Sequence, residues 1–188
     1  MVYYRQMNRN QILVRKISHL TDARYFAAMG VDWMSMGLNS DPASFMRWHT
    51  LRGWVEGVKL AAELIVPDDM LIAKTIIDAQ PEGIVFQEVG MSEGLPAMQL
   101  FFDVDKAGDV SIPEHSISIL AYDGFEKHKI AALDPQITFF QAEWTTGKLD
   151  SLLQSGYTGG ICFAGGEEDV TGVRDYELMD ELLQILQD

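Results

Sequence analysis

The chain has 188 residues, of which 47% are apolar, and its 28 acidic side chains against 14 Lys and Arg give a formal net charge of −14. This size and composition predict one globular domain, 1–188, with a full hydrophobic core. The negative charge argues against nucleic acid or an anionic membrane as a partner, because both require a basic face.

The lack of targeting signals and the single cysteine predict a cytoplasmic protein. The apolar runs are far shorter than the ~18 residues of a transmembrane helix, and the N-terminal extension 1–11 has no apolar signal core. Cys162 is the single cysteine, which excludes an internal disulfide and fits a reducing compartment. It is expected to pack as a small buried apolar residue. The histidines have no metal-ligand spacing with it, so we expect neither a metal nor a cofactor.

Short apolar runs alternate along the chain with helical segments that begin at Thr, Asp or Pro and end near Gly or Pro. The expected strands are 12–18, 33–38, 55–65, 83–89, 98–104, 116–122, 137–142 and 160–164. The expected helices are 21–29, 42–53, 67–79, 125–133, 145–155 and 176–187. The connections 90–97 and 107–115 are too reduced for a full helix.

This alternation predicts a parallel sheet with helical crossovers. Eight units favour a (β/α)8 TIM barrel that is trimmed at its fourth and fifth connections, and the alternative is an open doubly wound parallel sheet. In a barrel the functional residues lie at the carboxyl ends of the strands. The residues to examine there are Ser18, His19, Leu38, Asn39, Glu63, Gln87, Glu88, Asp103, Asp105, Asp123, Gln141, Glu143, Gly165 and Gly166.

The two ends of the chain carry motifs that resemble one enzyme family. Lys-Ile-Ser-His-Leu-Thr at 16–21 is followed by Asp-Ala and Gly-Val-Asp, and Ala-Gly-Gly-Glu at 164–167 is followed by Gly-Val-Arg-Asp at 172–175. These motifs resemble the opening and the ending of phosphoribosylanthranilate isomerase, a barrel of tryptophan biosynthesis. The resemblance implies an isomerase that performs an Amadori rearrangement of a phosphorylated aminosugar, with an Asp as general acid and a Cys as general base.

Carried over residue by residue, the resemblance places the general acid at Asp123, at the end of the sixth strand. The base position falls on Ser18. The neighbouring His19 is the alternative base, because an ordinary histidine has a pKa of ~6.5. The phosphate-binding position falls on Gly165 and Gly166, where glycine lets the backbone approach an anion. The implied partner is a small phosphorylated metabolite, and the oligomeric state is left open, with a homodimer as one alternative.

Three features of the family pattern are replaced in this chain. Ser18 stands for the family's Cys, Gln141-Ala142-Glu143 stands where a glycine pair is expected, and Asn39-Ser40-Asp41-Pro42 replaces a Ser-Pro-Arg loop. A serine hydroxyl is a weak base without an activating neighbour. Two alternatives to the isomerase therefore stay open. One is a catalytically inactive family member that binds or senses a small ligand, and the other is an enzyme with altered chemistry that uses the carboxylates of Asp123, Glu143 and Glu63.

Overall fold

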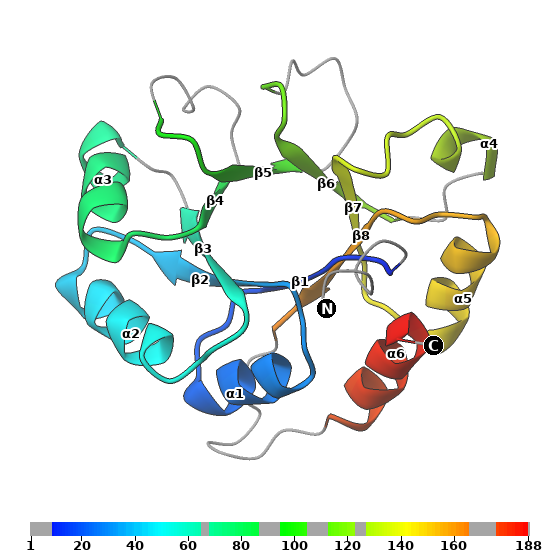
Figure 1. Cartoon of the computed structure of the whole chain (residues 1–188), viewed down its shortest axis with the longest axis horizontal. Helices are drawn as coiled ribbons and strands as arrows, with labels where there is room; N and C mark the ends of the chain where they lie inside the picture. Colours follow the sequence, from blue (N-terminus) through cyan, green and yellow to red (C-terminus); the bar gives the residue numbers. More distant parts are fainter. Residues whose placement is uncertain are drawn as a thin grey trace, which may run out of the picture.

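Eight parallel strands close into a barrel in the order β1 to β8, as the computed structural model shows (Figure 1). The structure describes residues 9–64, 68–86, 95–104, 113–122, 127–165 and 176–187. The strands are β1 (Ile12–Arg15), β2 (Trp33–Leu38), β3 (Lys59–Leu64), β4 (Gly83–Phe86), β5 (Gln99–Val104), β6 (Ile117–Ala121), β7 (Thr138–Gln141) and β8 (Gly160–Ala164). The pairing of β1 with β8 confirms the predicted TIM barrel over an open sheet.

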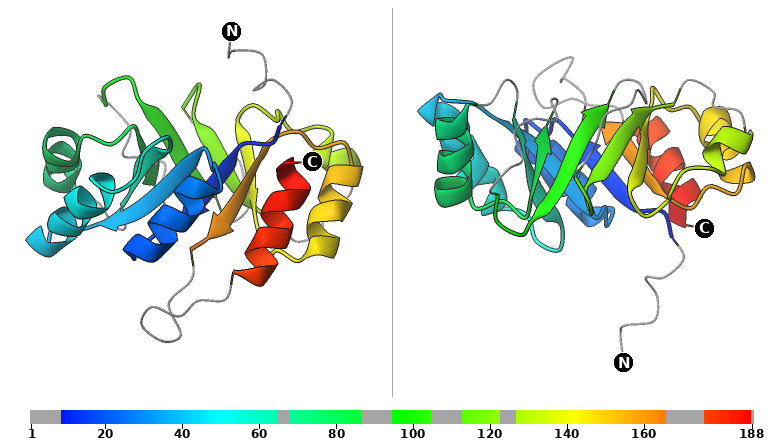
Figure 2. Two further views of the ribbon diagram at one scale, coloured as in Figure 1. Left: turned by 60° about the horizontal axis from the view of Figure 1, so that its bottom comes forward. Right: turned by 90° about the horizontal axis from the view of Figure 1, so that it is seen from above.

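Helices surround most of the barrel on its outside (Figures 1 and 2). They are α1 (Leu20–Ala28), α2 (Pro42–Arg52), α3 (Asp69–Lys74) with the π-helical turn η1 (Thr75–Ala79), α4 (Lys127–Ile130), α5 (Thr146–Gln154) and α6 (Glu177–Gln187). In the described parts of the connections between β4, β5 and β6, residues 95–98 and 113–116, no helix is present. The rest of the reduced connections predicted at 90–97 and 107–115 lies outside the described residues.

The helix starts follow from local chemistry. Asp41 accepts a hydrogen bond from the backbone N–H of Ala43, with Pro42 in the first turn, and Asp68 accepts one from Leu71. Thr145 caps α5 by accepting one from Lys148 at 3.3 Å. Each cap satisfies a backbone N–H that a helix start leaves without an internal partner. Within the described residues no helix is long and apolar enough to cross a membrane.

The barrel interior is built in layers of four side chains from alternate strands, as in other TIM barrels. One layer comes from the odd-numbered strands and holds Leu13, Ala61, Phe101 and Phe139. The next comes from the even-numbered strands, where Val85, Ile119 and Cys162 are joined by the buried Ser35. Side chains in a strand alternate between its two faces, so the following odd layer begins two residues later, at the carboxyl ends of the strands.

Two glycines make room for the aromatic rings of the lower layers. A Cβ on Gly160 would lie 2.2 Å from Cδ1 of Phe139, and one on Gly83 would lie 3.2 Å from Cε2 of Phe101. The rings of Phe101 and Phe139 meet edge to face at 5.9 Å between centroids, a favourable aromatic arrangement. The lower half of the barrel is therefore closed by tightly packed apolar side chains.

Candidate functional site at the carboxyl ends of the strands

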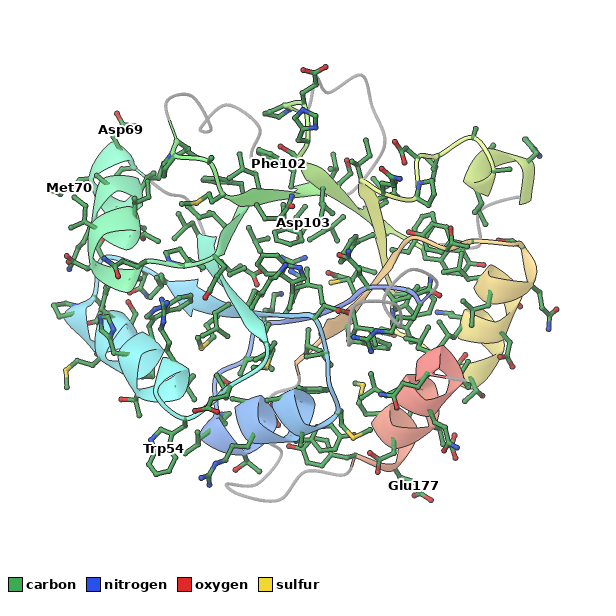
Figure 3. The ribbon with its side chains drawn as sticks, in the orientation of Figure 1. Trp54, Asp69, Met70, Phe102, Asp103 and Glu177 are labelled. Atoms are coloured by element: carbon green, nitrogen blue, oxygen red, sulfur yellow. The ribbon has the colours of Figure 1, made fainter. Side chains whose placement is uncertain are left out.

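The last odd layer of the barrel is polar. Nη1 of Arg15 donates hydrogen bonds to Oδ2 of Asp103 at 2.6 Å and to Oε1 of Gln141 at 2.7 Å. Nη2 of Arg15 donates to Oε1 of Glu63. The four side chains come from β1, β3, β5 and β7, and each stands two residues after an apolar residue of the lower odd-strand layer. Figure 3 shows Asp103 on the inner side of β5, opposite to Phe102.

This cluster holds two carboxylates against one guanidinium. The Arg15 and Glu63 side chains are 1% and 2% exposed, whereas that of Asp103 is 23% exposed. Burial alone would lower the pKa of Arg15, but the charge of Glu63, with smaller contributions that include Asp103, raises that pKa above its ordinary value. Arg15 therefore stays charged. Asp103 is the charged member of the cluster that meets solvent.

Ser35 and Cys162 support the cluster from the layer below. The hydroxyl of Ser35 donates to Oε2 of Glu63 at 2.8 Å, so both carboxylate oxygens of Glu63 are engaged. The Cys162 thiol lies 3.5 Å from Oε1 of Gln141. Burial raises the pKa of Cys162, and the positive charges of Arg15 and Lys16 offset part of that rise. A buried thiol of this kind stays protonated and unreactive, as expected for a packing residue.

Strand β1 ends earlier than the sequence suggests, because the backbone changes direction at Lys16. Lys16 has φ of +59°, a left-handed conformation that is costly for a residue other than glycine. Its N–H donates to Oγ of Ser35 at 3.3 Å, and the N–H of Ile17 then donates to the carbonyl of Ser35 at 2.8 Å. The predicted strand 12–18 is thus reduced to Ile12–Arg15, and its last inward-facing residue is Arg15.

Ser18 and His19 therefore lie beyond the strand end, where both are exposed. His19 is the residue before α1, and its side chain makes no capping hydrogen bond. Both residues line surface cavities next to α2, among them a groove with Leu20, Met46 and Arg47. Asp123 lies outside the described residues, so the acid proposed there has no structural placement.

The backbone at the start of the last loop is already engaged. The N–H of Gly165 donates to the carbonyl of Arg15 at 2.5 Å, and a Cβ on Gly165 would lie 2.6 Å from the same oxygen. Glycine is therefore required at 165 for close approach to β1. Gly166 lies outside the described residues. Glu143, the carboxylate expected after β7, is exposed, and its carbonyl accepts a hydrogen bond from Nζ of Lys148 at 3.1 Å.

A cavity of about 620 Å³ opens at this end of the barrel, between β1, β2, β3 and α2. Its polar lining residues are Lys16, Ser18, Asn39, Ser44, Arg47 and Glu63. Lys16 and Arg47 are exposed cations. Two cations beside amide and hydroxyl groups form an environment suited to a small anion.

Sequence reasoning found most of the polar layer but not its centre. Glu63, Asp103 and Gln141 stand at strand ends and were predicted to lie near the site. Arg15 was counted within a longer strand, next to the motif at 16–21. A charged residue directly after the apolar run Ile12-Leu13-Val14 is the signal that points to it, because the next inward position after Leu13 is 15.

Comparisons with known proteins agree on the fold. No protein-family model and no curated protein sequence matches the chain. Among solved structures, TrpF from Jonesia denitrificans superimposes with a TM-score of 0.72 at 11% identity, covering 95% of this chain and 97% of that one. Phosphoribosyl anthranilate isomerase from Thermococcus kodakaraensis gives a TM-score of 0.70 at 11% identity, with coverages of 97% and 100%. The chain has a phosphoribosylanthranilate isomerase-like barrel fold.

The same fold similarity extends to another enzyme. Thiamine phosphate pyrophosphorylase from Bacteroides thetaiotaomicron matches with a TM-score of 0.64 at 14% identity and 95% coverage of both chains. One barrel architecture hosts different chemistries, so function has to be argued from the residues of the site.

Proposed function

We propose that this isomerase-like barrel binds a small anionic metabolite, carrying a phosphate or carboxylate group, in the cavity beside β1 and β2. Lys16 carries the proposal, because it lines this cavity in a left-handed conformation that, among the described residues other than glycine, only Gln80 and His115 share. Backbone strain of this kind is concentrated at functional sites. Arg47 is a second cation in the lining of this cavity, and Asn39 and Ser18 supply groups that can hydrogen-bond to the anion. Cations are scarce in a chain of net charge −14, which makes two at one cavity informative.

The proposal includes the loss of the family's isomerisation, so that the chain serves as a ligand-binding or regulatory protein. Glu63 and Asp103 each accept a hydrogen bond from Arg15 at the carboxyl ends of the strands, and Arg15 stays charged and cannot accept a proton. Ser18, which the resemblance assigns as base, is exposed beyond the strand and lacks intrinsic basicity. These observations support binding without Amadori chemistry.

The competing candidate is an active isomerase of tryptophan biosynthesis. The fold similarity along nearly the whole chain and the two terminal motifs favour it. In that case Asp123 is the acid, Ser18 or His19 the base, and Gly165 with Gly166 the phosphate site. The test is rescue of a tryptophan auxotroph that lacks the isomerase. Growth with this chain would overturn the inactive reading, and no growth despite folded protein is the expected result.

Anion binding itself is tested by isothermal titration calorimetry with methyl phosphate. Lys16→Asn removes the charge but keeps a residue that tolerates the left-handed conformation, and we expect binding to weaken about tenfold, the scale of one charged hydrogen bond. Arg47→Gln should have a similar effect. The control is Lys129→Gln, an exposed site on α4. Equal affinities in all four proteins would contradict a site at Lys16 and Arg47.

A further inference from the structure

We propose that the ligand is an amphipathic anion whose alkyl or aryl group lies in an apolar groove between α1 and α2. This inference rests on the proposed function for the position of the anionic group, and it adds the part of the molecule that the cavity beside β1 does not hold. The groove has a volume of about 450 Å³, which is within the range of small-molecule sites of about 300 to 1,000 Å³.

The groove and the charged cavity share one wall. Ser18, Arg47 and Leu51 line both spaces. A molecule with its anionic group between Lys16 and Arg47 can therefore extend past Arg47 into the groove. The aliphatic stem of arginine packs well against apolar groups while its guanidinium binds the anion, so Arg47 suits the boundary between the two parts.

The remaining lining of the groove is mainly apolar. Leu20 and His19 contribute from the start of α1, and Ala43, Met46 and Thr50 contribute from α2. Met46 is 72% exposed, although the neighbouring outward positions on α2 hold the polar residues Arg47, His49 and Thr50. A methionine side chain is flexible and polarizable, and it adapts to the shape of an apolar ligand. An exposed Met at the rim of this groove is therefore available to pack against the apolar group of a ligand.

The chain provides a matched control for Met46. Met70, on α3, is 76% exposed and lies at the outer rim of the molecule, on a helix that does not line the groove (Figure 3). Changing either methionine to glutamate places a charge on an already exposed position, so neither change should unfold the protein. Only the change at Met46 places that charge beside the proposed apolar group.

The experiment compares methyl phosphate with hexyl phosphate by isothermal titration calorimetry. The two probes have the same anionic group and differ only in the chain. We expect hexyl phosphate to bind at least about tenfold more tightly, since each buried methylene adds favourable transfer free energy. Met46→Glu should abolish that advantage, which is taken as the ratio of the two affinities within each protein so that the effect of the new charge on the shared phosphate group cancels. Met70→Glu should preserve it.

The outcomes separate this inference from the proposed function. Equal binding of both probes, with Lys16→Asn weakening both, would overturn the groove as a subsite and leave the anion site intact. Tighter binding of hexyl phosphate that persists in Met46→Glu would also overturn it. Binding of 1-hexanol as tightly as hexyl phosphate would overturn the inference of one amphipathic anion, because the groove would then bind apolar groups independently of the anion site. Failure of both phosphates to bind would overturn the proposed function and the inference together.

Discussion

Two odd-strand layers of the barrel interior, with the even-strand layer between them, use the same strands for opposite purposes. Each side chain of the upper layer stands two residues after one of the lower layer. The lower layer consists of Leu13, Ala61, Phe101 and Phe139, and the upper layer consists of Arg15, Glu63, Asp103 and Gln141. The backbone positions are equivalent, so the difference comes from the side chains and from their distance to the solvent at the carboxyl ends of the strands.

The comparison distinguishes the apolar side chains that stabilise the barrel from the charged side chains at its open end. Apolar side chains are stabilised by burial in proportion to the area removed from water. A buried ion pair loses hydration, and its Coulomb attraction offsets that loss only with good geometry, so such a pair is weak evidence for stability. The upper layer therefore contributes charge at the open end of the barrel, where Glu63 lines the cavity beside β1 and β2.

The largest expected effect is at the centre of the upper layer. Arg15→Met leaves Glu63 and Asp103 without their guanidinium partner, and breaking a buried pair in this way costs about 3–5 kcal/mol. Urea unfolding at pH 7 measures the loss. Arg9→Met, which removes a partly exposed pair with Asp32, is the control and should cost about 1 kcal/mol or less.

A triple variant sharpens the same prediction. Arg15→Met combined with Glu63→Gln and Asp103→Asn removes all three charges, and it should recover most of the stability lost in Arg15→Met alone. If the triple variant is as unstable as the single one, the cluster stabilises the fold through packing rather than through charge balance.

The second effect is at the base of the barrel. Gly160→Ala places a methyl group 2.2 Å from the Phe139 ring, and overpacking of this kind costs about 1–3 kcal/mol. Gly147→Ala is the matched control, because nothing lies within 4 Å of its added Cβ and the residue lies in α5, where alanine favours the helix. Thermal unfolding of the two variants should give opposite shifts. An unchanged Tm for Gly160→Ala would mean that the apolar layer has room to relax.

The same contrast explains how far the sequence predicts this structure. The strands and most helices follow from apolar runs and from capping residues such as Asp41 and Thr145, which act over a few neighbouring positions. Such local signals are enough for the barrel topology, because alternating strands and helices admit few arrangements.

The site depends on contacts that local signals do not contain. Arg15 meets Asp103 and Gln141 across 88 and 126 residues of sequence, and only closure of the barrel brings them together. The left-handed turn at Lys16 is equally hidden, because lysine has no preference for that conformation. The predicted strand 12–18 therefore ran through this turn to Ser18, which lies beyond the end of β1. Asp123 and Gly166 remain predictions, since both lie outside the described residues.

The third effect is a pH dependence that comes from buried uncharged groups rather than from the charged upper layer. Burial raises the pKa of Cys162 and of Tyr157 in the folded protein, whereas in the unfolded chain they titrate near ~8.5 and ~10. Below those unfolded pKa values the folded and unfolded states hold the same protons, and the free energy of unfolding is at its full value. It falls as pH rises above them, because the unfolded chain then releases protons that the folded protein retains.

We expect the free energy of unfolding to fall by about 2 kcal/mol between pH 8.5 and 10 from Cys162 alone. Urea unfolding across this range measures it. Cys162→Ser does not titrate there and should give a flatter profile. The Tyr157 hydroxyl donates to the carbonyl of Thr138 at 2.7 Å. Tyr157→Phe removes this hydroxyl and should flatten the profile only above about pH 10. Parallel profiles for the wild type and Cys162→Ser would contradict a buried, protonated thiol.

The smallest effect lies at the boundary of the upper layer, and it is a gain in stability. Lys16→Asn replaces a left-handed lysine with a residue that adopts this conformation more readily, and we expect a gain of about 0.5–1 kcal/mol in urea unfolding. Lys16→Arg keeps both charge and strain and should change stability little. A loss in Lys16→Asn but not in Lys16→Arg would contradict strain relief, and would identify the Lys16 charge as a counter-ion for the surplus carboxylate of Glu63 and Asp103. A gain in stability together with weaker methyl phosphate binding would mean that Lys16 is kept in a strained conformation for the ligand. The open end of the barrel would then give up stability for binding, which the apolar lower layer does not do.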